Sequence, residues 1–183
     1  METWIDSNII FSGKIFAVRT GTVRLDDGRT AQRDVIENLG GVGIVPVLNN
    51  EVILIRQFRI AVNREIVEIP AGRLEDGETP ESCAGRELQE EIGYRAGKLI
   101  PVHAYYSSVG FTNERMHIFL GLDLAETARR PEQDERIQIL RVPLSEIEPK
   151  LRSGEFEDAK TIIGLYALLS YATIPGTGIR VTP

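Results

Sequence analysis

Hydrophobic and polar positions alternate over several short runs of the chain, and these runs predict β-strands. Val42 to Leu48 and Glu51 to Phe58 are rich in valine and isoleucine, and Asn49-Asn50 between them tolerates a tight turn, so we expect a hairpin there. The stretch VRLDDGRTAQRDVIE (23–37) predicts a second hairpin, because Asp27-Gly28 supplies the positive φ angles of a short turn. Further strands are expected at 64–70, 97–108, 114–124 and 136–144.

Three segments carry helical features. Thr79 is a suitable N-cap, Pro80 fits the first helical position and Gly93 fits the position after the last turn, so a helix is expected over 80–92. A helical pattern begins at Leu144, and a strongly apolar helix is expected over 158–171. Many strands and few helices in mixed order predict an α/β (α+β) fold, in which helices cover the faces of a sheet.

Length, composition and charge narrow the classes of function. The 183 residues fit one domain with a small appendage, and 42% hydrophobic residues suffice for a core. The net charge of −6 argues against a protein that binds the phosphate backbone of nucleic acids. No apolar run reaches the roughly 18 residues needed to span a bilayer, and the first ten residues do not resemble a signal peptide. We therefore expect a cytoplasmic protein that binds neither membranes nor nucleic acid.

Cysteine and histidine offer little catalytic chemistry. The single cysteine, Cys83, excludes an intramolecular disulfide and fits a reducing compartment. It lies among small residues of the predicted helix, so we expect a buried structural thiol rather than a nucleophile. His103 and His117 fall within strand patterns, where a structural histidine is commoner than a catalytic base.

The helix predicted at 80–92 carries three clustered carboxylates. Glu87, Glu90 and Glu91 fall within an arc of about 100° beside the apolar positions of the helix. An acidic face in contact with solvent is the ordinary interpretation. However, Glu87 and Glu91 form a like-charge pair four residues apart, and no lysine or arginine at the same spacing relieves it. A divalent cation such as magnesium would remove the repulsion, and the preceding turn Pro70 to Gly72 would let backbone carbonyls reach the same ion.

The stretch GRLEDGETPESCAGRELQEEIGY (72–94) resembles the Nudix box. The pattern is Gly, five residues, Glu, seven residues, then Arg-Glu-aliphatic-any-Glu-Glu-any-Gly-hydrophobic. Every charged and glycine position is filled, and only Tyr94 stands where an aliphatic residue is commoner. The matching residues are Gly72, Glu78, Arg86, Glu87, Leu88, Glu90, Glu91 and Gly93.

The resemblance implies a Nudix α/β/α sandwich with a mixed sheet and a hydrolase that uses Mg²⁺, with Mn²⁺ as an alternative. It assigns metal binding to Glu87, Glu91, Glu90 and the carbonyl of Ala71. It implies that Arg86 orients a glutamate of the box by a salt bridge. Gly72 and Glu78 would support the turn and the helix. The metal would neutralise a pyrophosphate and acidify a bound water.

A longer resemblance, over about residues 10–170, points to ADP-ribose pyrophosphatases and their relatives that hydrolyse nucleoside diphosphate sugars. The residues that carry it are IRQFR (55–59), EIPAG (68–72), SSVGFTNE (107–114) and DAKTIIGL (158–165). It implies hydrolysis of ADP-ribose or a related nucleoside diphosphate sugar to AMP and a sugar phosphate. The substrate-binding residues that it implies are Gln57, Arg59, Glu68, Ser108, Phe111 and Glu114.

Two positions leave alternatives open. Val109 stands where this subfamily commonly has a proline that is taken to mark preference for ADP-ribose, so a GDP-sugar pyrophosphatase of the GDP-mannose type is the first alternative. A non-catalytic nucleotide sensor is the second. In the acidic loop PEQDER (131–136), the resemblance favours Glu135 as the base that activates water, with Glu132 as the rival.

We expect three regions along the chain. Residues 1–40 would form an antiparallel β-extension that mediates homodimerisation, because apolar residues such as Ile15, Phe16 and Val18 lie outside the core and need cover. Residues 41–173 would form the Nudix hydrolase domain, and 174–183 an irregular tail.

Overall fold

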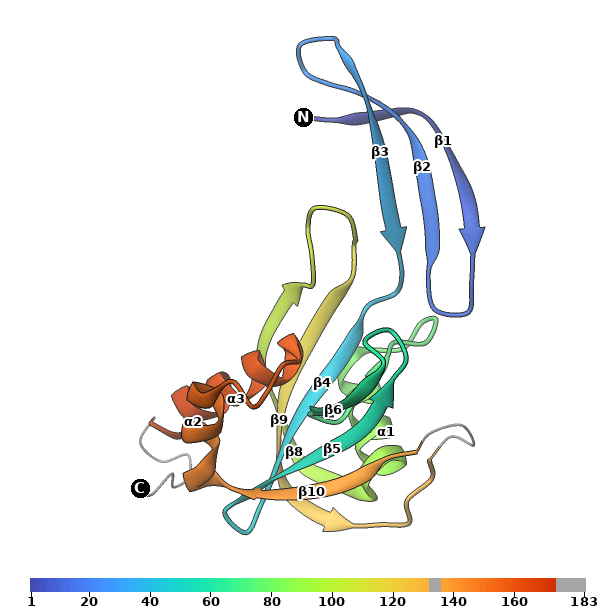
Figure 1. Ribbon diagram of the computed structural model, residues 1–183. Helices are drawn as coiled ribbons and strands as arrows, with labels where there is room; N and C mark the ends of the chain where they lie inside the picture. The colour runs from blue at the N-terminus through green and yellow to red at the C-terminus, as the bar shows by residue number, and fades with distance from the viewer. Residues whose placement is uncertain (132–135, 174–183) are drawn as a thin grey trace. The chain divides into compact units, whose positions relative to one another are not determined.

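The computed structural model describes residues 1–131 and 136–173, and its chain divides into two compact units (Figure 1). The first unit consists of Met1–Gly40 and Tyr105–Met116, and the second of Gly41–Ala104 together with the chain from His117 onward. The elements, in chain order, are β1 (Thr3–Ser12), β2 (Ala17–Arg24), β3 (Thr30–Glu37), β4 (Gly41–Leu48), β5 (Glu51–Arg59), β6 (Arg64–Glu68), β7 (Ala71–Arg73), α1 (Pro80–Glu87), a π-helical turn (Leu88–Ile92), β8 (Tyr94–Tyr106), β9 (Arg115–Glu126), β10 (Gln138–Pro143), α2 (Leu144–Ser153) and α3 (Ala159–Ala172).

The first unit contains an antiparallel sheet in the order β1-β2-β3. The predicted β2–β3 hairpin is present, and Gly28 in its turn has a φ of +85°, but Asp27 does not take the positive φ that was expected of it. Strand β1 was not predicted as a separate strand. Its pairing with β2 is shifted at two places, between Trp4 and Asp6 and between Ile9 and Phe11. Each shift moves the following side chains to the other face, so the sequence of β1 shows no regular alternation.

The second unit is built on a seven-stranded sheet whose main path is β10-β5-β4-β9-β8, with β6 on β5 and β7 on β4. The predicted hairpin of β4 and β5 is confirmed. Asn49 and Asn50 take φ angles of 50° and 64° in its turn, a conformation that asparagine tolerates better than most residues.

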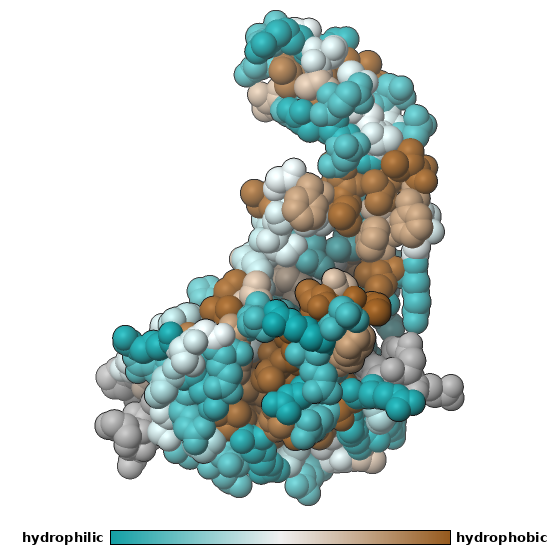
Figure 2. All heavy atoms as spheres, viewed as in Figure 1, coloured by the Kyte–Doolittle hydropathy of each residue, from teal (hydrophilic) through white to brown (hydrophobic). Residues whose placement is uncertain are grey.

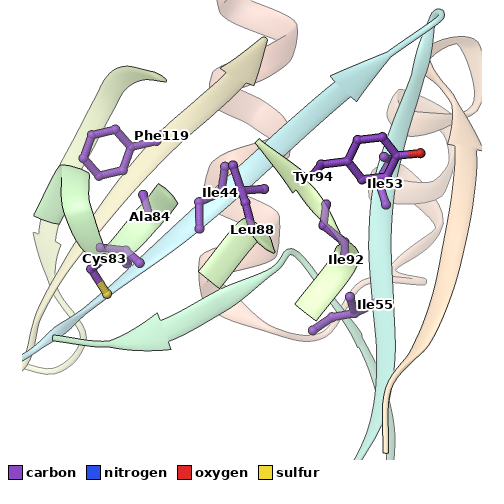
Figure 3. Packing of buried hydrophobic residues seen from close by; sticks show 10 residues of the cluster. Ile44, Ile53, Ile55, Cys83, Ala84, Leu88, Ile92, Tyr94 and Phe119 are labelled. Atoms are coloured by element: carbon purple, nitrogen blue, oxygen red, sulfur yellow. The ribbon is translucent and has the colours of Figure 1, made fainter. Parts of the chain in front are cut away.

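Successive residues of β4 face opposite layers, which explains why this strand is buried on both sides. Ile44 belongs to a buried cluster with Ala84 and Leu88 of the α1 side (Figure 3). Val45 lies instead against Gly164 of α3, where an added Cβ would come within 2.8 Å of a Val45 methyl. Helices thus cover both faces of the sheet, and the expected mixed sheet between helical layers is confirmed.

Boundaries differ from the predictions in physical detail. The predicted strand at 97–108 begins earlier, at Tyr94, directly after the left-handed Gly93. The strand predicted at 64–70 ends at Glu68, and the short β7 follows Pro70. Helices α2 and α3 begin where they were expected. The tail 174–183 and the loop 132–135 lie outside the described residues. No helix in the described ranges is long and apolar enough to cross a membrane.

Candidate active site

The caps of the acidic helix follow the sequence prediction. Thr79 is extended, and its hydroxyl oxygen accepts a hydrogen bond from the Ser82 N–H at 3.2 Å. Pro80 occupies the first turn, where its missing N–H costs nothing. At the other end Gly93 takes a φ of 74°, the left-handed conformation that ends helices. The acidic segment is therefore fixed at both ends by local interactions.

The last turn of this segment is π-helical rather than α-helical, which the sequence did not predict. Leu88–Ile92 forms the π turn, and Gly93 donates back to the carbonyls of Gln89 and Leu88. A π turn holds more residues than an α turn, so Glu87 and Glu91 span slightly less than one turn instead of slightly more. Leu88 and Ile92 remain in the core as expected.

Two of the three clustered carboxylates reach the backbone at residues 71–72, where a turn was expected and the structure has the short strand β7. A Cβ on Gly72 would overlap the carboxylate of Glu87, so only glycine leaves room for that side chain. The Ala71 N–H donates a hydrogen bond of 2.9 Å to Oε2 of Glu91. Both glutamates are buried, with 7% of Glu87 and 1% of Glu91 exposed. The buried carboxyl groups of Glu87 and Glu91 therefore converge on the short strand β7.

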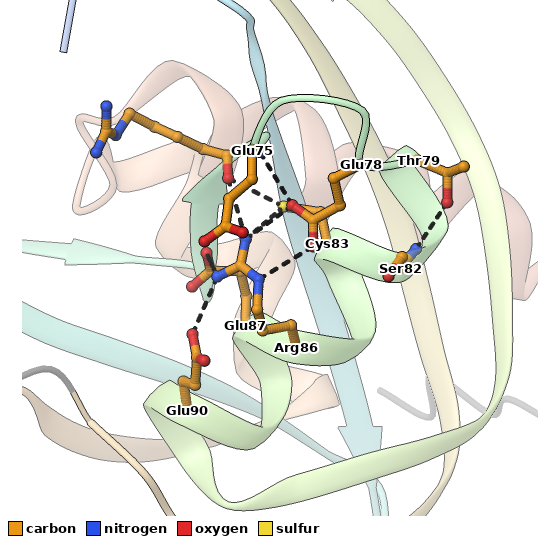
Figure 4. A network of polar contacts seen from close by, with 9 residues as sticks. Glu75, Glu78, Thr79, Ser82, Cys83, Arg86, Glu87 and Glu90 are labelled. Carbon is orange, nitrogen blue, oxygen red and sulfur yellow. Dashed lines mark hydrogen bonds and ion pairs between the residues drawn. The ribbon is translucent and has the colours of Figure 1, made fainter.

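Arg86 is the centre of the charge network on this helix (Figure 4). Its Nη1 lies 2.6 Å from Glu87 and 3.0 Å from Glu90, and its Nε and Nη2 each donate to the carboxylate of Glu78 at 3.0 Å. Nη2 also donates to the carbonyl oxygen of Arg73. The hydrogen bonds to Glu78 raise the pKa of Arg86 and lower that of Glu78, so both groups stay charged.

This network corrects one part of the sequence argument. The spacing argument found no lysine or arginine four residues away to relieve the Glu87–Glu91 pair, and only the family resemblance implied a salt bridge from Arg86. In the structure Arg86 pairs with its neighbour Glu87 and with Glu90 at the i, i+4 spacing. The guanidinium thus offsets part of the repulsion at Glu87 and Glu90.

The donor set fits a hard divalent cation nonetheless. Magnesium is commonly held by one or two carboxylates, with water and substrate phosphate oxygens completing its shell. Glu87 and Glu91, together at the Ala71–Gly72 backbone, are of this kind, whereas Glu90 is turned to Arg86. Within the described ranges, no three acidic, histidine or cysteine side chains form a complete metal-binding group on their own. Water and substrate phosphate oxygens would add to the ligands of a cation held here.

Three of the predicted substrate-binding residues form a second cluster. Nε and Nη2 of Arg59 donate to the two carboxylate oxygens of Glu68 at 2.5 and 2.8 Å. With its amide correctly oriented, Gln57 accepts a hydrogen bond from Arg59 Nη2 at 2.8 Å. The Glu68 side chain is 3% exposed and that of Arg59 is 42% exposed. The buried members thus hold one guanidinium at the surface.

This second cluster lies close to the acidic helix. The hydrogen bond to Glu68 is the main cause of the raised pKa of Arg59, and the negative charges of Glu91 and Asp158 contribute. The charge of Glu91 therefore acts on Arg59, which brings the predicted substrate cation and one predicted metal ligand together. Such an arrangement could hold a diphosphate between the guanidinium of Arg59 and a metal ion bound by Glu91.

The remaining predicted substrate residues, Ser108, Phe111 and Glu114, belong to the first unit. Their loop is tied to the β-extension, because the Ile36 N–H donates to the Phe111 carbonyl at 2.8 Å and Asn113 N–H donates to the Ile36 carbonyl at 3.2 Å. Asn38 adds a hydrogen bond to the Glu114 carboxylate. Phe111 is 52% exposed, and Val109 is 83% exposed.

The predicted base and the cysteine complete the set. Glu135, together with its rivals Glu132 and Asp134, lies outside the described residues. Cys83 is fully buried as expected, and burial raises the pKa of its thiol to about 12. The thiol is protonated at neutral pH and donates to the Arg73 carbonyl, so it cannot act as a nucleophile.

Sequence reasoning missed a group at the start of α3. Lys160 forms an ion pair with Glu68, and Asp158 lies 3.0 Å from Lys160. Thr161 is fully buried, and its hydroxyl accepts a hydrogen bond from the Ile69 N–H at 2.9 Å. The signal was a lysine and a threonine in the first turn of an otherwise apolar helix, but their partners lie 92 residues away in the chain.

Known proteins resemble the chain over most of its length. The family described as NUDIX domain matches residues 38–163. An ADP-ribose pyrophosphatase of Bacillus subtilis is 39% identical over 170 residues, which cover 91% of this chain and 92% of the relative. A methanol dehydrogenase activator of Bacillus methanolicus is 32% identical, with 91% and 92% covered. A GDP-mannose pyrophosphatase of Cronobacter sakazakii is 36% identical over 176 residues, with 87% and 91% covered.

A solved structure resembles the fold as well. The crystal structure of an ADP compounds hydrolase superposes with a TM-score of 0.83 and covers 93% of this chain and 94% of its own. Its sequence identity is 21%, so this likeness concerns the fold.

Proposed function

Because the chain belongs to the Nudix family and has the box of a Nudix pyrophosphohydrolase, we propose that it hydrolyses ADP-ribose or a related nucleoside diphosphate sugar to AMP and a sugar phosphate. The observation that carries this proposal is the convergence of buried Glu87 and Glu91 on the backbone of β7 at Ala71 and Gly72, with Glu91 within electrostatic reach of Arg59. The relative from Bacillus subtilis, named an ADP-ribose pyrophosphatase, supports the substrate class.

Nudix enzymes generally need a divalent metal ion, and we propose Mg²⁺, with Mn²⁺ as a substitute. When bound, the ion would neutralise the diphosphate and acidify a water molecule. Glu87 and Glu91 would hold it, with the carbonyl of Ala71 as a further ligand. Glu90 would join them after leaving Arg86, whose contacts to Glu78 would remain.

The chain's own groups have separate tasks in this proposal. Arg86 orients the helix carboxylates and does not touch the substrate. Arg59 binds the diphosphate through the part of its guanidinium that Glu68 leaves exposed. Ser108, Phe111 and Glu114 of the first unit stay predicted substrate contacts from the family resemblance, and Glu135 is proposed as the base that takes a proton from the attacking water.

A GDP-sugar pyrophosphatase is the second candidate. The GDP-mannose pyrophosphatase of Cronobacter sakazakii supports it, and so does Val109, which replaces the proline common among ADP-ribose pyrophosphatases. Proline would fix φ in this loop, whereas valine leaves the backbone freer. Among the described residues, the Val109 N–H donates no hydrogen bond, so a proline here would break none.

The first prediction tests the substrate through Val109. The wild type should hydrolyse ADP-ribose, ADP-glucose and GDP-mannose with specificity constants that differ by less than about a hundredfold, because the loop is not stiffened. Val109→Pro should raise the preference for ADP-ribose by about tenfold, the effect of one positioning contact. The measurement is kcat/KM for each substrate, with products identified by chromatography.

Two results would decide against parts of this proposal. A thousandfold preference for ADP-ribose in the wild type would show that position 109 does not set specificity. Turnover of none of the three substrates with Mg²⁺ or Mn²⁺ would favour the remaining candidate, a nucleotide sensor without catalysis.

We also propose that the enzyme is a homodimer formed through its β-extension. Figure 2 shows apolar side chains gathered over one end of the three-stranded sheet, and large ones are exposed there. They include Ile9, Ile10, Phe11, Ile15 and Phe16, which are between 38% and 65% exposed. A monomer rarely leaves so many large apolar groups of one small sheet in water.

The second prediction tests this assembly. The wild type should have the mass of a dimer by light scattering at micromolar concentration, and Ile10→Lys should shift it to the monomer by placing a charge in the interface. Ile60→Lys is the matched control, because Ile60 is 81% exposed in the β5–β6 turn of the second unit. A monomeric wild type, or equal effects of the two lysines, would argue against the extension as the interface.

The free thiol of Cys83 is compatible with the cytoplasm, where we place the enzyme.

A further inference from the structure

The first turn of α3 contacts Glu68 and Ile69 at the end of β6, directly before β7 in the chain. Lys160 forms its ion pair with Oε2 of Glu68, and the Thr161 hydroxyl accepts from the N–H of the next residue, Ile69. Asp158 organises both groups. Its Oδ1 lies 3.0 Å from the Lys160 ammonium, and its Oδ2 accepts from the N–H and the hydroxyl of Thr161 at 2.9 and 2.6 Å.

The side chains of this network differ in their exposure to solvent, which indicates different roles. The side chains of Glu68 and Lys160 are 3% and 14% exposed, whereas that of Arg59 is 42% exposed. Only Arg59 is therefore well placed to meet a ligand. Lys160 reaches the exposed guanidinium only through the carboxylate that they share.

The charges of the network explain what Lys160 contributes. Arg59 and Lys160 carry two positive charges, and Glu68 and Asp158 carry two negative ones. Without Lys160, the network of Arg59, Glu68 and Asp158 would carry a net charge of −1 and would repel an anion, whereas with Lys160 the four charges balance. With Lys160 present, Glu68 is shared between two cations, so part of the charge of Arg59 remains available to a diphosphate.

The lowered pKa of Glu68 agrees with these roles of Arg59 and Lys160. Burial alone would raise the pKa of the Glu68 carboxyl, but the hydrogen bonds from Arg59 and the charge of Lys160 outweigh burial and lower it. Glu68 is therefore ionised at neutral pH and can hold the guanidinium in a fixed orientation. Arg59 would otherwise have to order a flexible side chain whenever it bound a ligand.

We propose that Lys160 is a positioning residue for diphosphate binding: it shares Glu68 with Arg59, so that Arg59 is held in place while its own charge is less fully compensated. The inference rests on the proposed function in taking a diphosphate as the ligand of Arg59. Lys160 touches neither the substrate nor the metal in this role. Its removal should therefore weaken substrate binding while the chemical step is preserved.

The third prediction is a split between KM and kcat. Lys160→Met keeps the length of the side chain and removes its charge, and it should raise KM for the best nucleoside diphosphate sugar about tenfold with kcat within about twofold. Lys160→Arg should restore KM to within about threefold of the wild type. Lys150→Met is the matched control, because Lys150 pairs with Glu155 and Glu146 on the α2 side and should leave both constants unchanged.

A double-mutant cycle with Glu68 keeps the inference testable if Lys160→Met folds poorly, since a buried carboxylate that has lost one of its two cations is then the expected cause. Glu68→Gln removes that carboxylate, so adding Lys160→Met to it should have no further effect on KM. Additive effects of the two substitutions would overturn the inference. So would a loss confined to kcat, or a Lys160→Arg variant no better than Lys160→Met.

Binding of ADP separates this inference from the proposed function. Calorimetry with ADP and Mg²⁺ should show about tenfold weaker binding to Lys160→Met, with no difference between Glu68→Gln and the double variant. If the wild type binds ADP in this pattern but hydrolyses no nucleoside diphosphate sugar, the proposed function fails and the positioning role stands. If turnover is normal and Lys160→Met binds ADP as well as the wild type does, the positioning role is wrong and the proposed function stands.

Discussion

Glu91→Gln is expected to lower kcat/KM by about 10³-fold or more at saturating Mg²⁺, which corresponds to about 4 kcal/mol of transition-state stabilisation. Glutamine keeps the shape of the side chain and can still accept the hydrogen bond from the Ala71 N–H, so the backbone of β7 should remain in place. The loss of charge at a buried metal ligand, which is 1% exposed, is therefore the main change. The measurement is steady-state hydrolysis over a titration of Mg²⁺.

Glu87→Gln and Glu90→Gln extend this test to the other carboxylates. Glu87→Gln should lose activity on the same scale, and its fold should survive because Arg86 keeps its contacts to Glu78 and Glu90. Glu90→Gln should lose less, since Glu90 is turned to Arg86 in this structure. Circular dichroism and urea unfolding check that each variant is folded. Near-normal turnover of Glu91→Gln at any Mg²⁺ concentration would show that the metal assignment is wrong.

Gly72→Ala should lower kcat/KM by about 10²-fold, less than Glu87→Gln or Glu91→Gln. The new methyl would overlap the Glu87 carboxylate, so either the Glu87 side chain or the backbone of β7 must move by the order of an ångström. A displacement of this size can lower activity about 10²-fold. Overpacking of a close contact should also lower the free energy of unfolding by about 1–3 kcal/mol.

Gly85→Ala is the matched control for this substitution. Gly85 lies inside α1, and no atom of a neighbouring group lies within 4 Å of the position that its Cβ would take, so alanine fits without displacement. It should raise the free energy of unfolding by about 0.5–1 kcal/mol through its better helix propensity and leave kcat/KM unchanged. If Gly72→Ala behaved like Gly85→Ala, close approach of the turn to Glu87 would not matter for catalysis.

Local chemistry made parts of the fold predictable from the sequence. The Asn49-Asn50 turn, the cap at Thr79 and the left-handed Gly93 each depend on residues within a few positions of one another. The core positions of α1 were predictable for the same reason, because their spacing places them on one face. The glutamates of the box, in turn, stand at spacings that form a recognisable pattern.

The features that were not predicted depend on contacts between distant segments or on irregular backbone. The shifts in β1 hide its strand character, and the π turn at Leu88–Ile92 leaves no mark in a pattern read at α-helical spacing. Lys160 and Glu68 are separated by 92 residues, so only the folded chain brings their charges together. The role of Arg86 toward Glu87 was implied by the family resemblance and not by helical spacing.

The hydrogen bonds between β3 and the loop at residues 107–114 limit how freely this chain could be recombined with others. The region that matches the family begins at residue 38, yet Ile36 supplies both an N–H and a carbonyl to that loop. A chain cut at the start of the family domain would leave Phe111 and Asn113 without those backbone partners. The extension is therefore hydrogen-bonded to the loop at residues 107–114. A chimera that replaces the extension must replace this loop with the one that pairs with the new extension.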